Sequence, residues 1–370
     1  MIDAQQIEQR RQTLLTRSKS AIFIVAFYAA YLLLLFFANQ HWFKPLASLE
    51  PGNMYAVQFT LGFINILMLA PVIYYVSWEI TNLCFPGRKK VFIYTVCSTF
   101  ALTLGMGVFL IGTRYQLFPI HISEMWNSFT IFLLVSLIAI ICVTIISTFV
   151  WMYIGRHIVY VGKKTRVWYP VLVFILNTFF VGFLYTTIIH TWTTYMFLML
   201  ISVLSDVFAY LGGVLFGKHK MAPNISPKKS WEGLGIGFGI TTGIVCGFVG
   251  LFHINGAEAI DHTLYKFLGC QTCPEGGNLQ PYFWAIYISV ILIIMCVSAG
   301  GDLFFSFIKR RFNIKDFGYL IPGHGGVLDR IDALTFTFSF YFLITVICQL
   351  ICCFIPGHQT GLLLLWEWTA

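Results

Sequence analysis

Residues 301–332 read GDLFFSFIKRRFNIKDFGYLIPGHGGVLDRID, a polar segment that lies between two long apolar runs. The segment holds five of the 23 Lys and Arg residues and four of the 15 Asp and Glu residues. Its carboxylates can hold a cation, its basic side chains can bind phosphate oxygens, and its glycines let backbone N–H groups come close to a ligand. The segment therefore predicts a site for a metal-bound phosphate at a membrane surface.

The rest of the chain is strongly apolar, with 58% hydrophobic residues over 370 positions and a mean hydropathy of +0.80. Apolar runs of about 20 residues, long enough to cross a bilayer as helices, recur along it. We predict an all-α, polytopic integral membrane protein with about nine transmembrane helices, with eight or ten as the alternatives. The predicted spans are 21–38, 55–78, 91–113, 126–154, 168–190, 192–216, 234–253, 282–305 and 333–354.

The positions of the basic residues predict which way the chain crosses the membrane. If the N-terminus is cytoplasmic, 20 of the 23 Lys and Arg residues fall in cytoplasmic segments, and only Lys44, Arg114 and Lys266 fall outside. This asymmetry follows the positive-inside rule, so we place the N-terminus in the cytoplasm. The net charge of +8 then belongs to the cytoplasmic face, where it suits phosphates and anionic lipid headgroups and does not argue for nucleic acid. No small-residue cleavage site follows the first span, which we expect to be a retained anchor.

Three regions are expected from the distribution of ionisable residues. Residues 1–190 contain five spans without ionisable residues inside them, so we predict an N-terminal transmembrane scaffold. Residues 191–354 are the predicted catalytic transmembrane domain, and residues 355–370 form a C-terminal tail in which we find no functional pattern. In the loop 254–281, Cys270 and Cys273 are a disulfide candidate, with half of a metal site as the alternative.

The sixth predicted span carries a carboxylate deep inside it. Asp206 lies about ten residues, hence roughly 15 Å, from the predicted end of the helix. A carboxylate at that depth costs several kcal/mol unless it is paired, hydrated or bound to metal, so we expect a functional role. A buried structural ion pair or a protonated acid is the alternative.

A short basic loop, 218–233, follows this span. Two prolines restrict its backbone, and its polar side chains include Ser226, Lys228 and Lys229. We predict that these three residues bind phosphate. An ordinary basic loop that obeys the positive-inside rule is the alternative reading.

Carboxylates and basic residues share helix faces in the last two spans. Asp302, Ser306 and Lys309 follow one another at i, i+4 and i+7, which places them on one face of a helix. Asp329 and Asp332 share a face if the last helix has already begun at residue 329. These faces are where we expect the polar site to be built.

Glycines have two predicted uses. In the seventh span they recur at short intervals and are expected only to allow close helix packing. Between the last two spans, Gly325 and Gly326 are expected to bring backbone N–H groups to a phosphate. His324 beside them is a candidate phosphate donor or proton carrier, with a structural role equally open.

Two segments resemble the signature of a known family. The pattern S-x-x-K-R-x4-K-D-x-G-x3-P-G-H-G-G-x-x-D-R-x-D runs from Ser306 to Asp332. The pattern D-x-x-A-Y-x-x-G-x-x-F-G-K-x4-P-x-x-S-P-K-K-S-W-E-G runs from Asp206 to Gly233. Both are similar to the phosphatidate cytidylyltransferases, also called CDP-diacylglycerol synthases, which usually have Thr where this chain has Ser230. The likeness covers about residues 195–345.

The resemblance implies the reaction CTP + phosphatidate → CDP-diacylglycerol + diphosphate in a polytopic homodimer, with CTP, phosphatidate and membrane lipids as partners. It implies Mg²⁺ as cofactor, with a second monovalent or divalent cation left open, and Asp302 and Asp329 as metal ligands. Contacts to CTP or phosphatidate are expected from Ser226, Lys228, Lys229, Lys309, Arg310, Gly325, Gly326 and Arg330. Further catalytic candidates are Asp206, Ser306, Lys315, Asp316, His324 and Asp332.

Transporters and other CTP-dependent lipid enzymes are the alternative classes of function. Intramembrane acids and glycine-rich helices also occur in transporters, although these tend to place polar residues in two related halves. A CTP-dependent lipid kinase and a cytidylyltransferase that acts on ether lipids are closer alternatives. By likeness, the bacterial inner membrane is favoured over the endoplasmic reticulum, with the active site on the cytoplasmic side.

Overall fold

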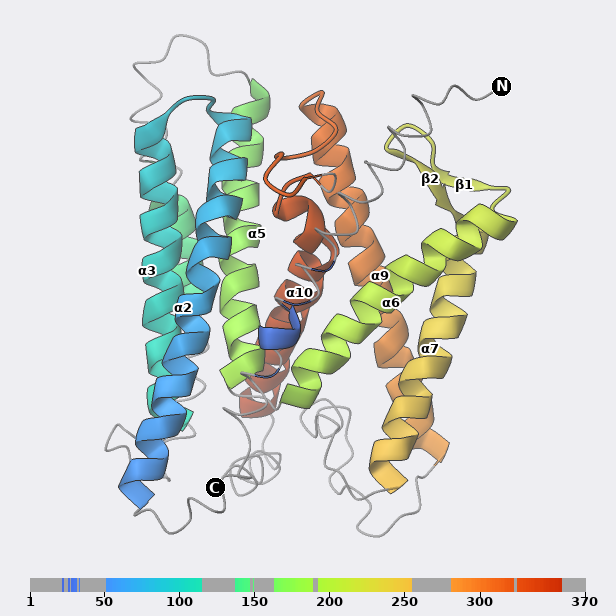
Figure 1. The fold of residues 1–370 in the computed structure, drawn as a ribbon, viewed down its shortest axis with the longest axis horizontal. Coiled ribbons are helices and arrows are strands. Elements are labelled where there is room, and N and C mark those ends of the chain that lie inside the picture. Colours follow the sequence, from blue (N-terminus) through green and yellow to red (C-terminus); the bar gives the residue numbers. More distant parts are fainter. Residues whose placement is uncertain are drawn as a thin grey trace.

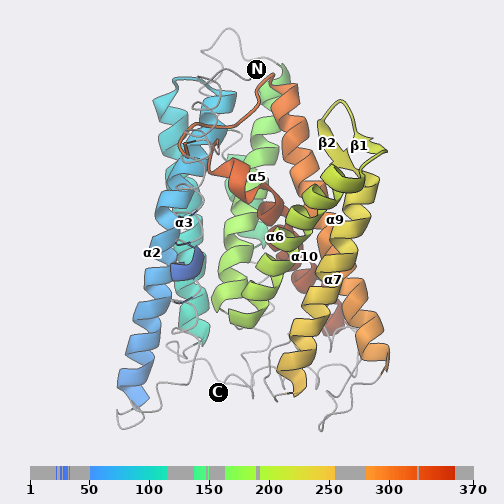
Figure 2. The same ribbon diagram turned by 45° about the vertical axis from the view of Figure 1, so that its right-hand side comes forward.

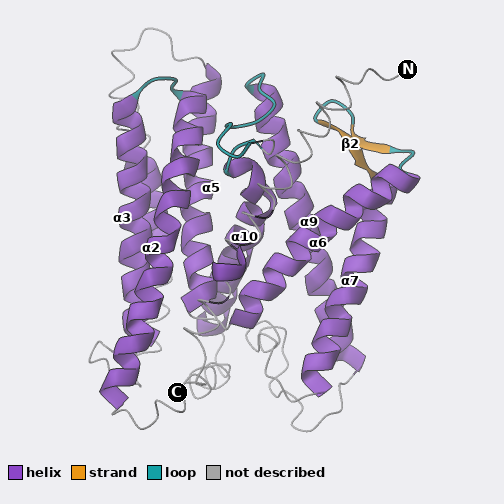
Figure 3. Ribbon diagram, in the orientation of Figure 1, coloured by secondary structure: helices purple, strands orange, loops and turns teal. Residues whose placement is uncertain are grey.

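The structure is a computed structural model that describes residues 51–114, 137–146, 163–188, 192–254, 281–322 and 325–354, with residues 22, 26, 28–31, 33 and 149. The described part is almost entirely helical (Figures 1 and 3). Its long helices are α2 (Pro51–Cys84), α3 (Lys89–Arg114), α5 (Lys163–Ile188), α6 (Trp192–Phe216), α7 (Trp231–Ile254), α9 (Pro281–Arg311) and α10 (Leu328–Phe354).

Six of these helices are long and apolar enough to cross a membrane, namely α2, α3, α5, α6, α9 and α10. The chain is therefore an all-α integral membrane protein, as predicted. The predicted spans 168–190 and 192–216 are separate helices, because α5 ends at Ile188 and α6 begins at Trp192. The total of nine spans stays a prediction, since most of the ranges 21–38 and 126–154 lie outside the described residues. The loop with Cys270 and Cys273 and the tail 355–370 also lie outside them.

The helices form two groups with α10 between them (Figures 1 and 2). Helices α2, α3 and α5 pack together on one side, α6, α7 and α9 pack on the other, and α10 packs against both α5 and α9. Aromatic rings join the groups at the level of Phe183, Tyr195 and Phe338, whose ring centroids lie 5.0–5.7 Å apart. Tyr31 from the N-terminal part packs on the same rings. Such ring pairs add to the stability gained by burying apolar area.

The basic segments gather at one end of the bundle. The turn between α2 and α3, the start of α5, the segment between α6 and α7 and the connection between α9 and α10 all lie at the top of Figure 1. These are the described segments in which the positive-inside pattern placed the basic residues. Their common position is what alternate crossing of a membrane requires.

The segment between α6 and α7 is a β-hairpin, which the all-α expectation had not included. Strand β1 (Lys220–Ala222) pairs antiparallel with β2 (Ser226–Ser230). The strands are too short for a period-two pattern to show, and the prolines favoured an extended loop without specifying its partner. The hairpin rests on α6 and α7 at the end where the basic segments lie.

Close contact between α6 and α7 depends on particular glycines. A Cβ added at Gly237 would lie 2.7 Å from the Ala209 backbone nitrogen, and one at Gly233 would lie 2.5 Å from the Ala209 carbonyl oxygen. Gly235 and Gly239 have no such neighbour within 4 Å. The predicted packing role is therefore confirmed for some of these glycines and not for all of them.

Gly237→Ala should destabilise the helix pair by about 1–3 kcal/mol, because the added methyl group meets backbone that cannot rotate away. Gly239→Ala is the matched control, two residues along the same helix. It should leave stability unchanged or raise it by up to about 1 kcal/mol, since alanine favours helix. Thermal unfolding of the two variants in detergent measures the difference, and equal transition temperatures would contradict this packing account.

Candidate functional site

Five charged side chains from four elements meet below the basic end of the bundle. Lys229 Nζ of β2 lies 2.5 Å from Asp302 Oδ2 of α9. The Asp206 carboxylate of α6 interacts electrostatically with both of these residues. Asp332 of α10 interacts with Asp302, Asp206 and Lys309. The cluster brings residues of three helices and the hairpin together, and we call these five residues the acidic cluster.

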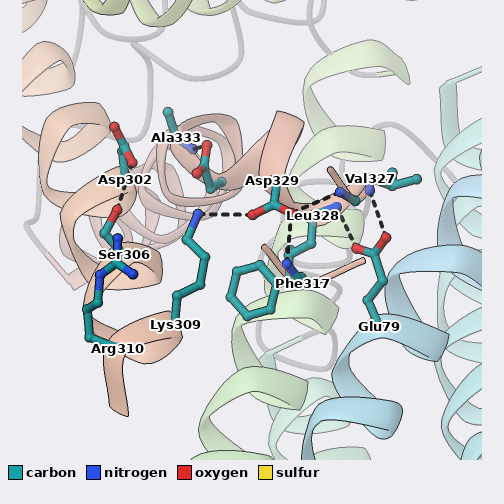
Figure 4. A network of polar contacts seen from close by, with 12 residues as sticks. Glu79, Asp302, Ser306, Lys309, Arg310, Phe317, Val327, Leu328, Asp329 and Ala333 are labelled. Carbon is teal, nitrogen blue, oxygen red and sulfur yellow. Dashed lines mark hydrogen bonds and ion pairs between the residues drawn. The ribbon is translucent and has the colours of Figure 1, made fainter. Parts of the chain in front are cut away.

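The face of α9 carries the next part of the site, as its spacing predicted. Ser306 Oγ donates a hydrogen bond to Asp302 Oδ1 at 3.4 Å. Lys309 Nζ lies 2.9 Å from Asp329 Oδ1 and 5.4 Å from the centroid of the Phe317 ring. Figure 4 shows Lys309 reaching to Asp329, with Asp302 and Ser306 in contact beside it. Since α10 begins at Leu328, Asp329 and Asp332 both lie on a helix, as their expected common face requires.

Asp329 anchors the connection between α9 and α10. Its Oδ2 atom accepts hydrogen bonds from the backbone N–H groups of Phe317 at 2.8 Å and Gly326 at 2.9 Å, while Oδ1 faces Lys309. The side chain is 3% exposed. The carboxylate is thus bound on both oxygen atoms, which makes it a structural anchor whatever else it binds.

The glycine turn before α10 has a specific backbone requirement. Gly325 has φ +83°, a left-handed conformation that side chains rarely adopt. A Cβ there would also lie 3.0 Å from Asp329 Oδ2 and 3.3 Å from Asp316 Cβ. Asp316 is therefore close to this turn, whereas His324 lies outside the described residues.

The hairpin divides its two lysines between opposite faces, because successive residues of a strand point to opposite sides. Lys229 points to Asp302, while Lys228 is exposed and Ser226 is half-buried. Arg310 Nε donates to the Ile225 carbonyl oxygen at 3.3 Å and so ties α9 to the hairpin.

Glu232, which precedes the predicted span 234–253, closes the other side of the hairpin. Its carboxylate bonds the His219 ring and the backbone N–H groups of Lys218 and His219. The bond to the His219 ring contributes most to lowering the pKa of the Glu232 carboxyl to about 2. The carboxylate is therefore ionised and holds the hairpin to the start of α7.

The remaining predicted basic residues are at the surface. Lys228, Arg310, Lys315 and Arg330 are exposed at the end of the bundle where the hairpin lies. They lie at the same end of the molecule as the acidic cluster. Their predicted contacts with phosphate stay predictions.

One acidic residue in this region was missed. The span 55–78 was expected to end before Glu79, and the first five spans were expected to lack ionisable residues, which was wrong. Helix α2 continues to Cys84 because Ile80 and Cys84 pack into the core, and Glu79 is 0% exposed inside it. An acid flanked by Trp78 and Ile80 was the signal that could have extended the span.

The number and kind of possible ligand side chains decide whether a metal ion could bind in this site. Among the described residues, no group of three or more His, Cys, Asp or Glu side chains is arranged to hold a metal ion. Mg²⁺ needs fewer protein ligands than this, because it is commonly bound by one or two carboxylates together with substrate phosphates and waters. Neighbouring carboxylates in the acidic cluster are chemically suited to that mode of binding.

Comparisons with known proteins agree with this chemistry. The model of the "Cytidylyltransferase family" matches residues 9–348. A Mycoplasma pneumoniae protein named "Putative phosphatidate cytidylyltransferase" is 28% identical over 311 residues, which cover 79% of this chain and 76% of that protein. "Phosphatidate cytidylyltransferase" of Rickettsia felis is 39% identical over 145 residues, 38% of this chain and 54% of that protein. The protein of the same name from Mycobacterium bovis is 41% identical over 141 residues, 38% of this chain and 37% of that protein.

Proposed function

This chain belongs to the cytidylyltransferase family, and from that premise we propose that it is a phosphatidate cytidylyltransferase, which makes CDP-diacylglycerol and diphosphate from CTP and phosphatidate. The observation that carries the proposal is the acidic cluster, in which Asp206, Lys229, Asp302, Lys309 and Asp332 converge from four elements. Phosphate chemistry at a membrane surface needs such a pairing of carboxylates with basic side chains.

The proposed reaction needs little proton transfer. A phosphate monoester such as phosphatidate carries about −1.5 to −2 charges at pH 7, so its oxygen is already a nucleophile. This oxygen bonds to the α-phosphorus of CTP, the bond from that phosphorus to the bridging oxygen of the β-phosphate breaks, and diphosphate leaves. The protein then acts by positioning the two phosphates and by stabilising charge. Lys229 and Lys309 are the basic side chains that we expect to bind these phosphates, because each already forms an ion pair with a carboxylate of the site.

We propose Mg²⁺ as the cofactor, with Asp302 and Asp329 as its protein ligands. Asp302 is the better placed of the two, since it interacts with a second carboxylate, Asp206, across the cluster. For Asp329 to bind a cation, Lys309 must give up Oδ1 and turn to a phosphate oxygen. When bound, a divalent cation supplies Lewis-acid polarisation of the α-phosphate and neutralises the leaving diphosphate.

We also propose that the basic end of the bundle faces the cytoplasm, which is where CTP is available. The positive-inside pattern supports this orientation. The bacterial sources of the similar proteins favour the bacterial inner membrane over the endoplasmic reticulum. A homodimer is proposed on family likeness alone.

A product assay tests the proposed function. Purified protein in detergent should convert radiolabelled CTP and phosphatidate into a lipid that retains CMP, with EDTA abolishing turnover and added Mg²⁺ restoring it. A transporter would form no lipid product. A CTP-dependent kinase would form a phosphorylated lipid without CMP, and preference for an ether-linked substrate would redirect the assignment within the family.

A further inference from the structure

We infer that Glu79 is a positioning residue for the proposed reaction: from α2 it holds the start of α10, and thereby Asp329 and Asp332, in register with the acidic cluster. The inference rests on the proposed function and assigns a part in it to the N-terminal helices. It begins from a buried acid. Glu79 is 0% exposed, and none of the described Lys, Arg or His side chains forms an ion pair with it. A buried carboxylate of this kind needs strong hydrogen-bond donors to offset its desolvation.

The donors are at the beginning of another helix. Glu79 Oε1 accepts from the Val327 N–H at 2.8 Å, and Oε2 accepts from the Leu328 N–H at 2.8 Å (Figure 4). The first N–H groups of a helix lack partners within that helix, and the helix dipole favours negative charge beside them. Glu79 therefore caps α10 from a helix 248 positions away in the sequence.

Two glycines make room for this cap. A Cβ at Gly318 would lie 2.7 Å from Glu79 Oε1, and one at Gly326 would lie 2.5 Å from the same atom. Both glycines belong to the connection between α9 and α10. The connection thus approaches the carboxylate of α2 so closely that no side chain fits between them.

The same connection is held from its other side by Asp329. Gly326 donates its N–H to Asp329 Oδ2, while the next two N–H groups bond Glu79. Two carboxylates from different helices therefore fix three successive backbone N–H groups. Because Asp329 and Asp332 lie in the first turns of α10, displacement of its start would move both away from Asp302 and Lys309.

Glu79→Gln tests the inference, with Ser77→Ala as the matched control. Ser77 lies two residues earlier in α2 and is 0% exposed, and its hydroxyl has no hydrogen-bond partner among the described residues. We expect Glu79→Gln to lower kcat per folded molecule by on the order of 100-fold, as misplacement by about 1 Å can do. Hydrogen exchange in peptides that contain Val327 and Leu328 should accelerate at least tenfold, while exchange in α3 should not change. Ser77→Ala should show neither effect.

A purely structural role would lower the yield or the melting temperature and leave kcat of the folded fraction intact, which would overturn the inference. Unchanged exchange at residues 327–328 would overturn it as well. If Glu79→Gln does not fold, Gly318→Ala crowds the same carboxylate and should give the same two changes. If the wild-type protein makes no CDP-diacylglycerol, the proposed function fails, and the exchange comparison alone decides whether Glu79 fixes the start of α10.

Discussion

Asp302→Asn should reduce CDP-diacylglycerol formation by about 1,000-fold while the protein remains folded in the membrane. Asp302 lies at the centre of the acidic cluster. It contacts Lys229 and Ser306 and interacts electrostatically with Asp206 and Asp332. Asparagine preserves the shape of the side chain but removes its charge. It therefore weakens both the proposed cation site and the contact that orients Lys229.

The control for Asp302→Asn is Ser289→Ala on the same helix. Ser289 Oγ donates to the Ala285 carbonyl oxygen within α9, far from the cluster, so the change should leave turnover within twofold of wild type. Initial rates across a Mg²⁺ titration, normalised to monodisperse protein, measure both variants. Near wild-type turnover in Asp302→Asn would remove Asp302 from the site and with it the proposed Mg²⁺ ligand.

Contacts within one helix were predictable from the sequence. The positions i, i+4 and i+7 placed Asp302, Ser306 and Lys309 on one face of α9, and the structure confirms the contact between the first two. The depth of Asp206 predicted a functional role, and the structure places it within electrostatic reach of the opposite charge of Lys229 and the like charge of Asp302. Helix periodicity and the cost of charge in a membrane are local properties, so one sequence suffices to apply them.

Contacts between distant helices were not predictable in the same way. Nothing in the residues around Glu79 indicates that the start of α10 lies against it, since the pairing depends on how α2 and α10 each pack on α5. The β-hairpin was missed for a related reason. Its two short strands acquire their geometry from resting on α6 and α7, and no local pattern specified that support.

Asp329→Asn should lower both stability and turnover, which separates it from Asp302→Asn. Lys309 is 13% exposed, and its contact with Asp329 Oδ1 is an ion pair away from solvent. Loss of the carboxylate leaves this ammonium group buried without its partner, which should cost about 3–5 kcal/mol. The backbone bonds from Phe317 and Gly326 also weaken, because a neutral amide oxygen is a poorer acceptor. Chemical unfolding and the product assay, run on the same preparation, measure the two losses.

The double variant Lys309→Met/Asp329→Asn distinguishes the anchor from the ligand. Removing the ammonium group as well should restore much of the stability, since Lys309 is then no longer buried without its ion-pair partner. Turnover should stay low, because the variant still lacks a cation from the site and a carboxylate beside the proposed Mg²⁺. Full recovery of turnover together with stability would show that Asp329 acts only as an anchor of the α9–α10 connection. Asp302 would then be the one protein ligand of Mg²⁺ left in the proposal. In that case the Mg²⁺ concentration for half-maximal turnover should be the same in Asp329→Asn as in the wild type.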